Sequence, residues 1–263
     1  ILDDKEYKLD KNDGENNLHS GFVRSHCKMY DARYGKSKEG NYVEFSRLSP
    51  KFEQGFPGDL EQRIRYTLTD NNELIIDYRM ATNETTVVNP TNHTYFNLNG
   101  QDNGNILQHR LEIYANSFLE IDEDFVPTGN ILNVENTPMD FRIKKIIGKQ
   151  IDYNDVQIRR AKGYDHNYVF TNDGKLKKMA KLYCDESGIT MTVYSDLCGM
   201  QLYTGNFLDG VVGKGGTRYE EKAGICFETQ YYPNACNEEH FPSSVLKAGQ
   251  TYKSRTIYEL AVS

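Results

Sequence analysis

The sequence has no tryptophan, no long apolar run and no paired cysteine motif. Its aromatic content comes from 19 Tyr and 12 Phe, which suits half-buried strands and a cleft lined by aromatic faces. A transmembrane helix needs about 20 consecutive apolar residues, so no membrane span is predicted, and no signal peptide pattern is visible. The five cysteines lie far apart without a C-x-x-C pair. This spacing argues against a zinc motif or disulfide framework and favours reduced thiols in the cytoplasm.

The sequence also lacks a basic stripe. The net charge is −7, with acidic and basic residues interspersed along all 263 positions. Proteins that bind nucleic acid depend on clustered Lys and Arg, so we expect no nucleic-acid partner.

Alternating apolar and polar residues predict antiparallel strands rather than helices. Ile64, Tyr66 and Leu68 alternate with polar neighbours in residues 62–69, and a turn at 70–72 leads into a second alternating run at 74–80. Residues 41–48, and 178–184 with 189–195, repeat this pattern. Short helices are expected only at 142–150 and 152–160. We therefore predict an all-β fold, a large antiparallel β-sandwich with few short helices, in a single domain over residues 1–263.

Residues 91–100, T-N-H-T-Y-F-N-L-N-G, concentrate polar side chains after a strand that ends before Pro90. A histidine among asparagines is costly to bury unless each polar group has a partner. His93 can exchange a proton near neutral pH, since its ordinary pKa is about 6.5. On this stretch alone, a hydrogen-bonded corner of a sheet explains the pattern equally well.

Further segments of this kind follow a fixed order along the chain. They are N-N-L-H-S-G (16–21), G-F-P-G (55–58), G-Y-D-H-N-Y (163–168), Q-L-Y-T-G-N-F-L-D-G (201–210), F-E-T-Q-Y-Y-P-N-A-C-N (227–237) and F-P-S-S-V-L-K-A-G (241–249). Each motif alone is weak. The series over residues 7–260 resembles the aldose 1-epimerases, also called galactose mutarotases, and implies a galactose mutarotase-like supersandwich.

The resemblance implies an isomerase that interconverts the α and β anomers of free aldohexoses such as galactose and glucose, without cofactor or metal. It implies Glu228 as the catalytic base and His93 as the catalytic acid. The residues implied to hold the sugar are His19, Tyr95, Asp165 and Gln201. His166 follows Asp165 directly, and neighbouring residues of a strand face opposite sides, so His166 is expected to be structural.

Three other functions stay open. A glycosidase would use a carboxylate pair, which Glu228 and Asp165 could supply. A sugar-binding or regulatory homologue with impaired catalysis is the second. A metal site built from His19, His93, Asp165 and Glu228 is the third, although these residues lack the spacing of common zinc motifs.

The family also carries a G-R-x-x-N-R-I motif, whose arginine binds the sugar, and no segment here matches it. We therefore expect a missing N-terminal portion and weaker sugar binding, by roughly 10–200-fold for one charge-assisted hydrogen bond. Arg24 and Arg33 are the candidates to replace that arginine.

Overall fold

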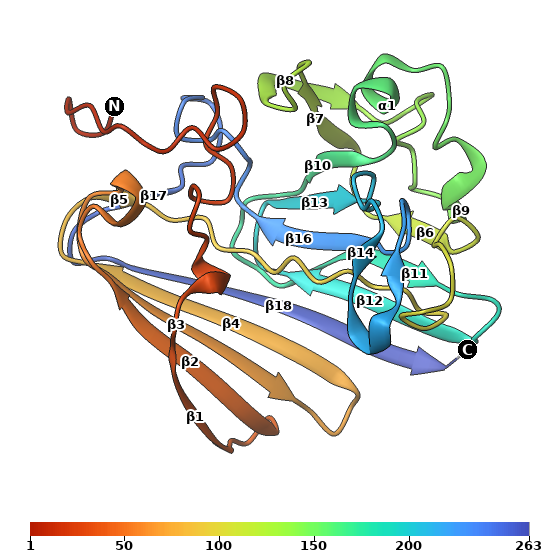
Figure 1. Ribbon diagram of the computed structural model, residues 1–263, viewed down its shortest axis with the longest axis horizontal. Helices are drawn as coiled ribbons and strands as arrows, with labels where there is room; N and C mark the ends of the chain where they lie inside the picture. The colour runs from red at the N-terminus through yellow and green to blue at the C-terminus, as the bar shows by residue number, and fades with distance from the viewer. Residues whose placement is uncertain (263) are drawn as a thin grey trace. The chain divides into compact units, whose positions relative to one another are not determined.

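The computed structural model describes residues 1–262, and most of its regular secondary structure consists of antiparallel strands (Figure 1). It contains two compact units, residues 1–90 with 243–255, and residues 91–242 with the chain from 256 onward. The predicted all-β antiparallel fold is confirmed, while the single domain stays a prediction. No helix among residues 1–262 is long and apolar enough to cross a membrane.

The first unit is built around four strands that pair in chain order. They are β1 (Asp31–Lys36), β2 (Asn41–Ser49), β3 (Leu60–Leu68) and β4 (Glu73–Thr82) (Figure 1). β18 (Thr251–Val262) follows β4 in the sheet and is divided between the units after Arg255. The remaining elements are the 3₁₀ helices η1 (Ser25–Cys27) and η2 (Glu53–Gly55) and the paired strands β5 (Thr86–Val87) and β17 (Val245–Leu246).

The second unit contains two large sheets and the small two-stranded sheet of β14 (Val211–Val212) and β15 (Arg218–Tyr219). One large sheet has the order β16 (Cys226–Gln230), β13 (Gly199–Tyr203), β10 (Asp165–Val169), β7 (Ser117–Ile121) and β8 (Pro127–Asn133). The other continues from β18 through β12 (Ile189–Ser195), β11 (Lys177–Tyr183), β6 (Arg110–Ile113) and β9 (Lys145–Ile146). Smaller elements are η3 (Ile147–Lys149), α1 (Val156–Ala161) and η4 (Lys214–Gly216).

The core of the second unit fixes which face of β16 is buried against the other sheet. The Tyr258 hydroxyl donates to the carbonyl of Phe227 at 2.9 Å, and the Phe96 and Tyr258 rings lie 4.9 Å apart. Phe227 has no exposed surface. Because side chains alternate along a strand, this packing directs Cys226 and Glu228 to the opposite face.

Most of the predicted strands are confirmed, with small shifts at their ends. Residues 41–48, 74–80, 178–184 and 189–195 correspond to β2, β4, β11 and β12. In β3, Ile64 and Tyr66 are half-buried as expected, but Leu68 is 63% exposed and Thr67 is buried. The alternation therefore fails at the end of that strand.

One expected helix is wrong and the other is shorter than expected. Residues 142–150 form β9, which pairs with β6, and then η3. Residues 152–160 contain only α1, which begins at Val156. The Asp155 carboxylate accepts hydrogen bonds from the amides of Gln157 and Ile158, so the helix starts where its N-cap residue stands.

Candidate active site

The 91–100 segment lies beside the start of β16. Phe96 and Ile225 exchange backbone hydrogen bonds of 2.8 and 2.9 Å, and the Asn97 amide donates to the Ala223 carbonyl at 3.3 Å. A Cβ atom at Gly224 would lie 2.9 Å from the Cβ of Tyr95, so only glycine permits this approach. The contacts bring His93 and Tyr95 to the polar face of β16.

His109, which directly precedes β6, supports the same segment. It is 3% exposed, and its Nε2 accepts a hydrogen bond from the Leu98 amide at 3.1 Å. Burial lowers the pKa of His109, which keeps the imidazole neutral and able to accept. No sequence motif marks this residue.

Strand register gathers the other polar groups on one face of the β10–β13–β16 sheet. Gln201 on β13 is opposite Glu228 on β16. Tyr203 is opposite both Cys226 on β16 and Asp165 on β10. Residues two apart on a strand share a face, so all five side chains lie on the same side of the sheet.

His93 contacts two of these side chains through its two ring nitrogens. Nε2 lies 3.4 Å from Oε1 of Glu228, and Nδ1 lies 3.4 Å from Sγ of Cys226. The His93 side chain is 33% exposed, whereas that of Glu228 is 7% exposed. The imidazole is thus held by the thiol on one side and by the carboxyl group on the other, with access from solvent.

The pKa of Glu228 is raised to about 8, first by burial and second by the negative charge of Asp165. Burial also raises the pKa of Asp165, to about 6, against a hydrogen bond of 2.6 Å that the Gln201 amide donates to its Oδ1. Desolvation and a neighbouring like charge both favour the neutral form of a carboxyl group. Glu228 therefore exchanges its proton close to neutral pH.

Two amide oxygens on this face have no hydrogen-bond partner among residues 1–262. They are Oε1 of Gln201 and Oδ1 of Asn167, both buried, and the two residues are opposite each other in the β10–β13 pair. Buried acceptors without partners are rare and need an explanation. A hydroxyl donor on a bound molecule would supply one.

Aromatic rings border His93. Its ring lies 5.1 Å from that of Tyr95 and 5.9 Å from that of Tyr203, and the two tyrosines are 6.0 Å apart. Burial raises the pKa of both phenols, that of Tyr203 to about 12, so both stay neutral. Such rings offer an apolar surface beside the polar groups.

Two histidines of the sequence analysis lie elsewhere. His166 has no exposed surface, packs edge-on against Phe118 at 5.7 Å, and has its pKa lowered to about 3 by burial. His166 therefore lies buried, and its structural role stays a prediction. His19 belongs to the first unit, where it and Ser20 adopt left-handed backbone conformations with φ of 52° and 70°, and its contact with a sugar stays a prediction.

Three residues of this site could hold a metal ion. Ligand atoms of His93, Cys226 and Glu228 lie within 4.8 Å of one another, and nitrogen, sulfur and oxygen donors of this kind suit zinc. This set differs from the predicted one, because it contains Cys226 instead of His19 and Asp165. A metal ion here would take up the same atoms that are available for proton transfer.

Sequence reasoning missed Cys226, Asn167 and Tyr203. Each lies two positions from a predicted site residue on the same strand, namely Glu228, Asp165 and Gln201. The period of two was therefore the signal that could have found them.

An accessible imidazole against a buried carboxyl group, on a sheet face with unpartnered amide oxygens, defines a candidate acid–base site for a polar small molecule. The sequence model of the aldose 1-epimerase family matches residues 1–259. The chain belongs to the aldose 1-epimerase family, and the resemblance noted in the sequence is confirmed.

Individual relatives agree with this assignment. The chain is 41% identical to galactose mutarotase from Bos taurus over 100% of this chain and 74% of that protein. It is 33% identical to aldose 1-epimerase from Escherichia coli (strain K12) over 98% of this chain and 74% of that protein. The structure resembles that of an aldose epimerase homologue from C. elegans, with a TM-score of 0.88 and 29% identity over 100% of this chain and 77% of the other. The predicted galactose mutarotase-like fold is confirmed.

The raised pKa of Glu228 predicts how stability depends on pH. Between the ordinary pKa of 4.5 and about 8, the folded protein keeps a proton that the unfolded chain releases, so the free energy of unfolding falls as pH rises. One unit of pKa corresponds to about 1.4 kcal/mol. We expect Glu228→Gln to become more stable relative to wild type as pH rises from 4.5 to 8, in urea denaturation series. The exposed control Glu239→Gln should show a flat difference, and a flat difference for Glu228→Gln as well would contradict the raised pKa.

Proposed function

We propose that the chain catalyses the interconversion of α and β anomers of free aldohexoses such as galactose and glucose, with Glu228 as base and His93 as acid. Membership of the aldose 1-epimerase family makes the chain a carbohydrate epimerase. The observation that carries the residue roles is the 3.4 Å contact between His93 Nε2 and Glu228 Oε1 on a buried, polar sheet face.

The reaction requires two proton transfers at neighbouring oxygens. The Glu228 carboxylate takes the proton of the C1 hydroxyl while His93 protonates the ring oxygen, and the C1–ring oxygen bond breaks to give an aldehyde. Rotation about C1–C2 presents the other carbonyl face, and the reverse transfers close the ring. Each positioned acid or base contributes typically about 10²–10⁴-fold, and no cofactor takes part.

The short distance between the two groups suits this reaction. His93 Nε2 and Glu228 Oε1 lie 3.4 Å apart. The C1 hydroxyl oxygen and the ring oxygen are bonded to the same carbon, so an acid and a base that reach them must lie close to each other. A sugar edge that carries both oxygens and lies beside the two side-chain tips would meet both.

The pKa values support these assignments. A general base works best when its pKa is near the working pH, and that of Glu228 is about 8. The Cys226 thiol stays protonated because burial raises its pKa well above the ordinary value. Its contact with Nδ1 of His93 orients the ring and leaves Nε2 for the ring oxygen.

The remaining predicted residues would hold the substrate. Asp165 accepts from sugar hydroxyls, Gln201 Oε1 offers a buried acceptor, and Tyr95 covers the apolar ring face. His19 keeps its predicted role as a hydroxyl contact. The proposed partner is thus a neutral monosaccharide. We expect no binding to nucleic acid or to a membrane, and we expect the protein to act in the cytoplasm.

A glycosidase is the second candidate, because Glu228 and Asp165 share one sheet face and their charges are coupled. Glycoside hydrolysis needs one protonated and one ionised carboxyl group. An assay with an aryl galactoside separates the two functions, since mutarotation releases no phenol. We expect no release.

The first prediction for catalysis concerns the base. Glu228→Gln keeps the shape of the side chain but cannot accept the proton, so the enzymatic rate of mutarotation should fall by at least about 10²-fold. Polarimetry of fresh α-D-galactose and α-D-glucose measures this rate. Glu239→Gln is the matched control on an exposed glutamate and should leave the rate unchanged. A wild-type rate in Glu228→Gln would show that Glu228 is structural.

The second prediction concerns the pH profile. The acid limb of kcat/KM should follow the ionisation of Glu228 in the free enzyme, with an apparent pKa well above 4.5. Asp165→Asn removes the like charge, so the limb should move to lower pH, whatever happens to the maximum rate. Asp173→Asn, on an exposed loop, should leave the limb in place. A limb that stays put in Asp165→Asn would mean that a different group controls it.

A further inference from the structure

The first unit has a charged sheet face whose ion pairs run across the strands. Arg33 on β1 and Arg65 on β3 both bind Glu44 on β2. Next to them, Arg255 on β18 binds Asp77 on β4 and Glu39 in the β1–β2 turn. Each of these carboxylates is therefore already engaged by at least one guanidinium group.

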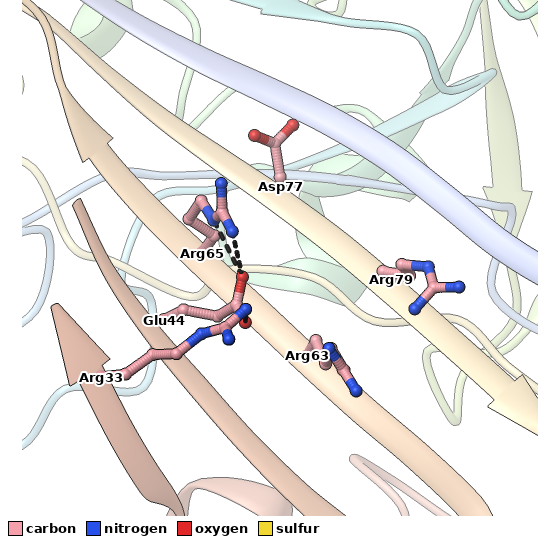
Figure 2. A pocket seen from close by; sticks show the side chains of 6 residues that line it. All are labelled: Arg33, Glu44, Arg63, Arg65, Asp77 and Arg79. Carbon is pink, nitrogen blue, oxygen red and sulfur yellow. Dashed lines mark hydrogen bonds and ion pairs between the residues drawn. The ribbon is translucent and has the colours of Figure 1, made fainter. Parts of the chain in front are cut away.

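Arg63 and Arg79 do not take part in these ion pairs. They are directly opposite each other in the antiparallel β3–β4 pair. Within residues 1–262, neither side chain forms an ion pair or hydrogen bond with a carboxylate. Figure 2 shows both head groups without a dashed contact, while Arg65 reaches Glu44. Like charges directly opposite on neighbouring strands destabilise a sheet, so this pair lacks a counter-ion.

The pair borders a hollow of about 230 Å³, lined by Arg33, Glu44, Arg63, Arg65, Asp77 and Arg79 (Figure 2). Its lining carries four guanidinium groups and two carboxylates, an excess of two positive charges among these six side chains. The chain as a whole carries a net charge of −7. This local excess is therefore opposite in sign to the rest of the protein.

We propose that this hollow binds a phosphate group, either inorganic phosphate or a phosphate monoester, between Arg63 and Arg79. A phosphate carries a charge of about −1.5 to −2 at neutral pH, which matches the two uncompensated guanidinium groups. The planar guanidinium group pairs with phosphate oxygens through two parallel hydrogen bonds. Glu44 and Asp77 also line the hollow, and the acidic remainder of the chain disfavours a long polyanion such as nucleic acid.

The site is separate from the proposed sugar site in its residues and chemistry. Its lining residues all belong to the first unit, whereas Glu228 and His93 belong to the second. The neutral sugars of the proposed reaction carry no phosphate. Phosphate binding therefore stands or falls independently of mutarotation, and Glu228→Gln should bind phosphate as wild type does.

Titration calorimetry at constant ionic strength tests the proposal. The ligands are inorganic phosphate, glucose 6-phosphate and, as the uncharged control, glucose at equal concentration. We expect one saturable phosphate site in the wild type, and a Kd at least about tenfold higher in Arg63→Gln and in Arg79→Gln, since one charge-assisted pair is lost in each. Arg218→Gln removes the same charge from an exposed strand of the second unit and should leave the Kd unchanged.

The two phosphate sources are separated by their relative affinity. Equal Kd values for both ligands identify the phosphate group alone as the recognised part, whereas tighter glucose 6-phosphate identifies a monoester; either supports the site. Three results would overturn the site. They are binding heats for phosphate that glucose also produces, binding that does not saturate at millimolar phosphate, and a loss of phosphate affinity in Arg218→Gln equal to that in Arg63→Gln.

Thermal unfolding gives a second readout that also checks folding of the variants. Phosphate should raise the Tm of the wild type but not that of Arg63→Gln. Without phosphate, Arg63→Gln should have the higher Tm, because the repulsion between Arg63 and Arg79 is gone. A lower Tm for Arg63→Gln without phosphate would show that the two arginines are not in repulsion and would contradict the proposal.

Discussion

The site depends on a carboxyl group held out of water beside an imidazole. Glu228 is 6% exposed and its pKa is about 8, which places its proton exchange where a catalytic base needs it. Burial supplies the larger part of that shift and the charge of Asp165 the smaller. When Glu228 is ionised in the folded protein, the free energy of unfolding is lower. The packing on the other face of β16, through Phe227 and Tyr258, is what holds the strand in place against that cost.

The geometry of the site follows from the sheet more than from its loops. Three paired strands fix Asp165, Gln201 and Glu228 at neighbouring positions on one face. The 91–100 segment then adds His93, held by the Phe96–Ile225 bridge, the His109–Leu98 hydrogen bond and the space that Gly224 leaves. Paired strands thus position Glu228, and backbone contacts to β16 position His93, the two groups proposed to transfer protons; a site held by its scaffold in this way favours precise catalysis.

The fold, and the set of residues that form the candidate site, could be predicted because their signals are local or carried by motifs. Alternation identified β2, β4, β11 and β12, and it placed Asp165 and His166 on opposite faces. Other features depend on which strands pair and in what register, and no single strand contains that information. Pairing and register decide that Cys226 and Asn167 lie beside the predicted site residues. They also decide that Arg63 lies opposite Arg79. The expected helix at 142–150 failed because pairing with β6 overrides a weak local preference there.

We infer that the folded protein holds a proton on Glu228 near neutral pH. Carbon NMR of protein labelled at the glutamate side-chain carboxyl tests it directly, with the Glu228→Gln spectrum identifying the resonance. We expect this resonance to titrate with an apparent pKa near 8, separate from the exposed glutamates. Titration at or below the ordinary value of 4.5 would contradict it, because Glu228 would then be ionised and solvated like a surface carboxylate.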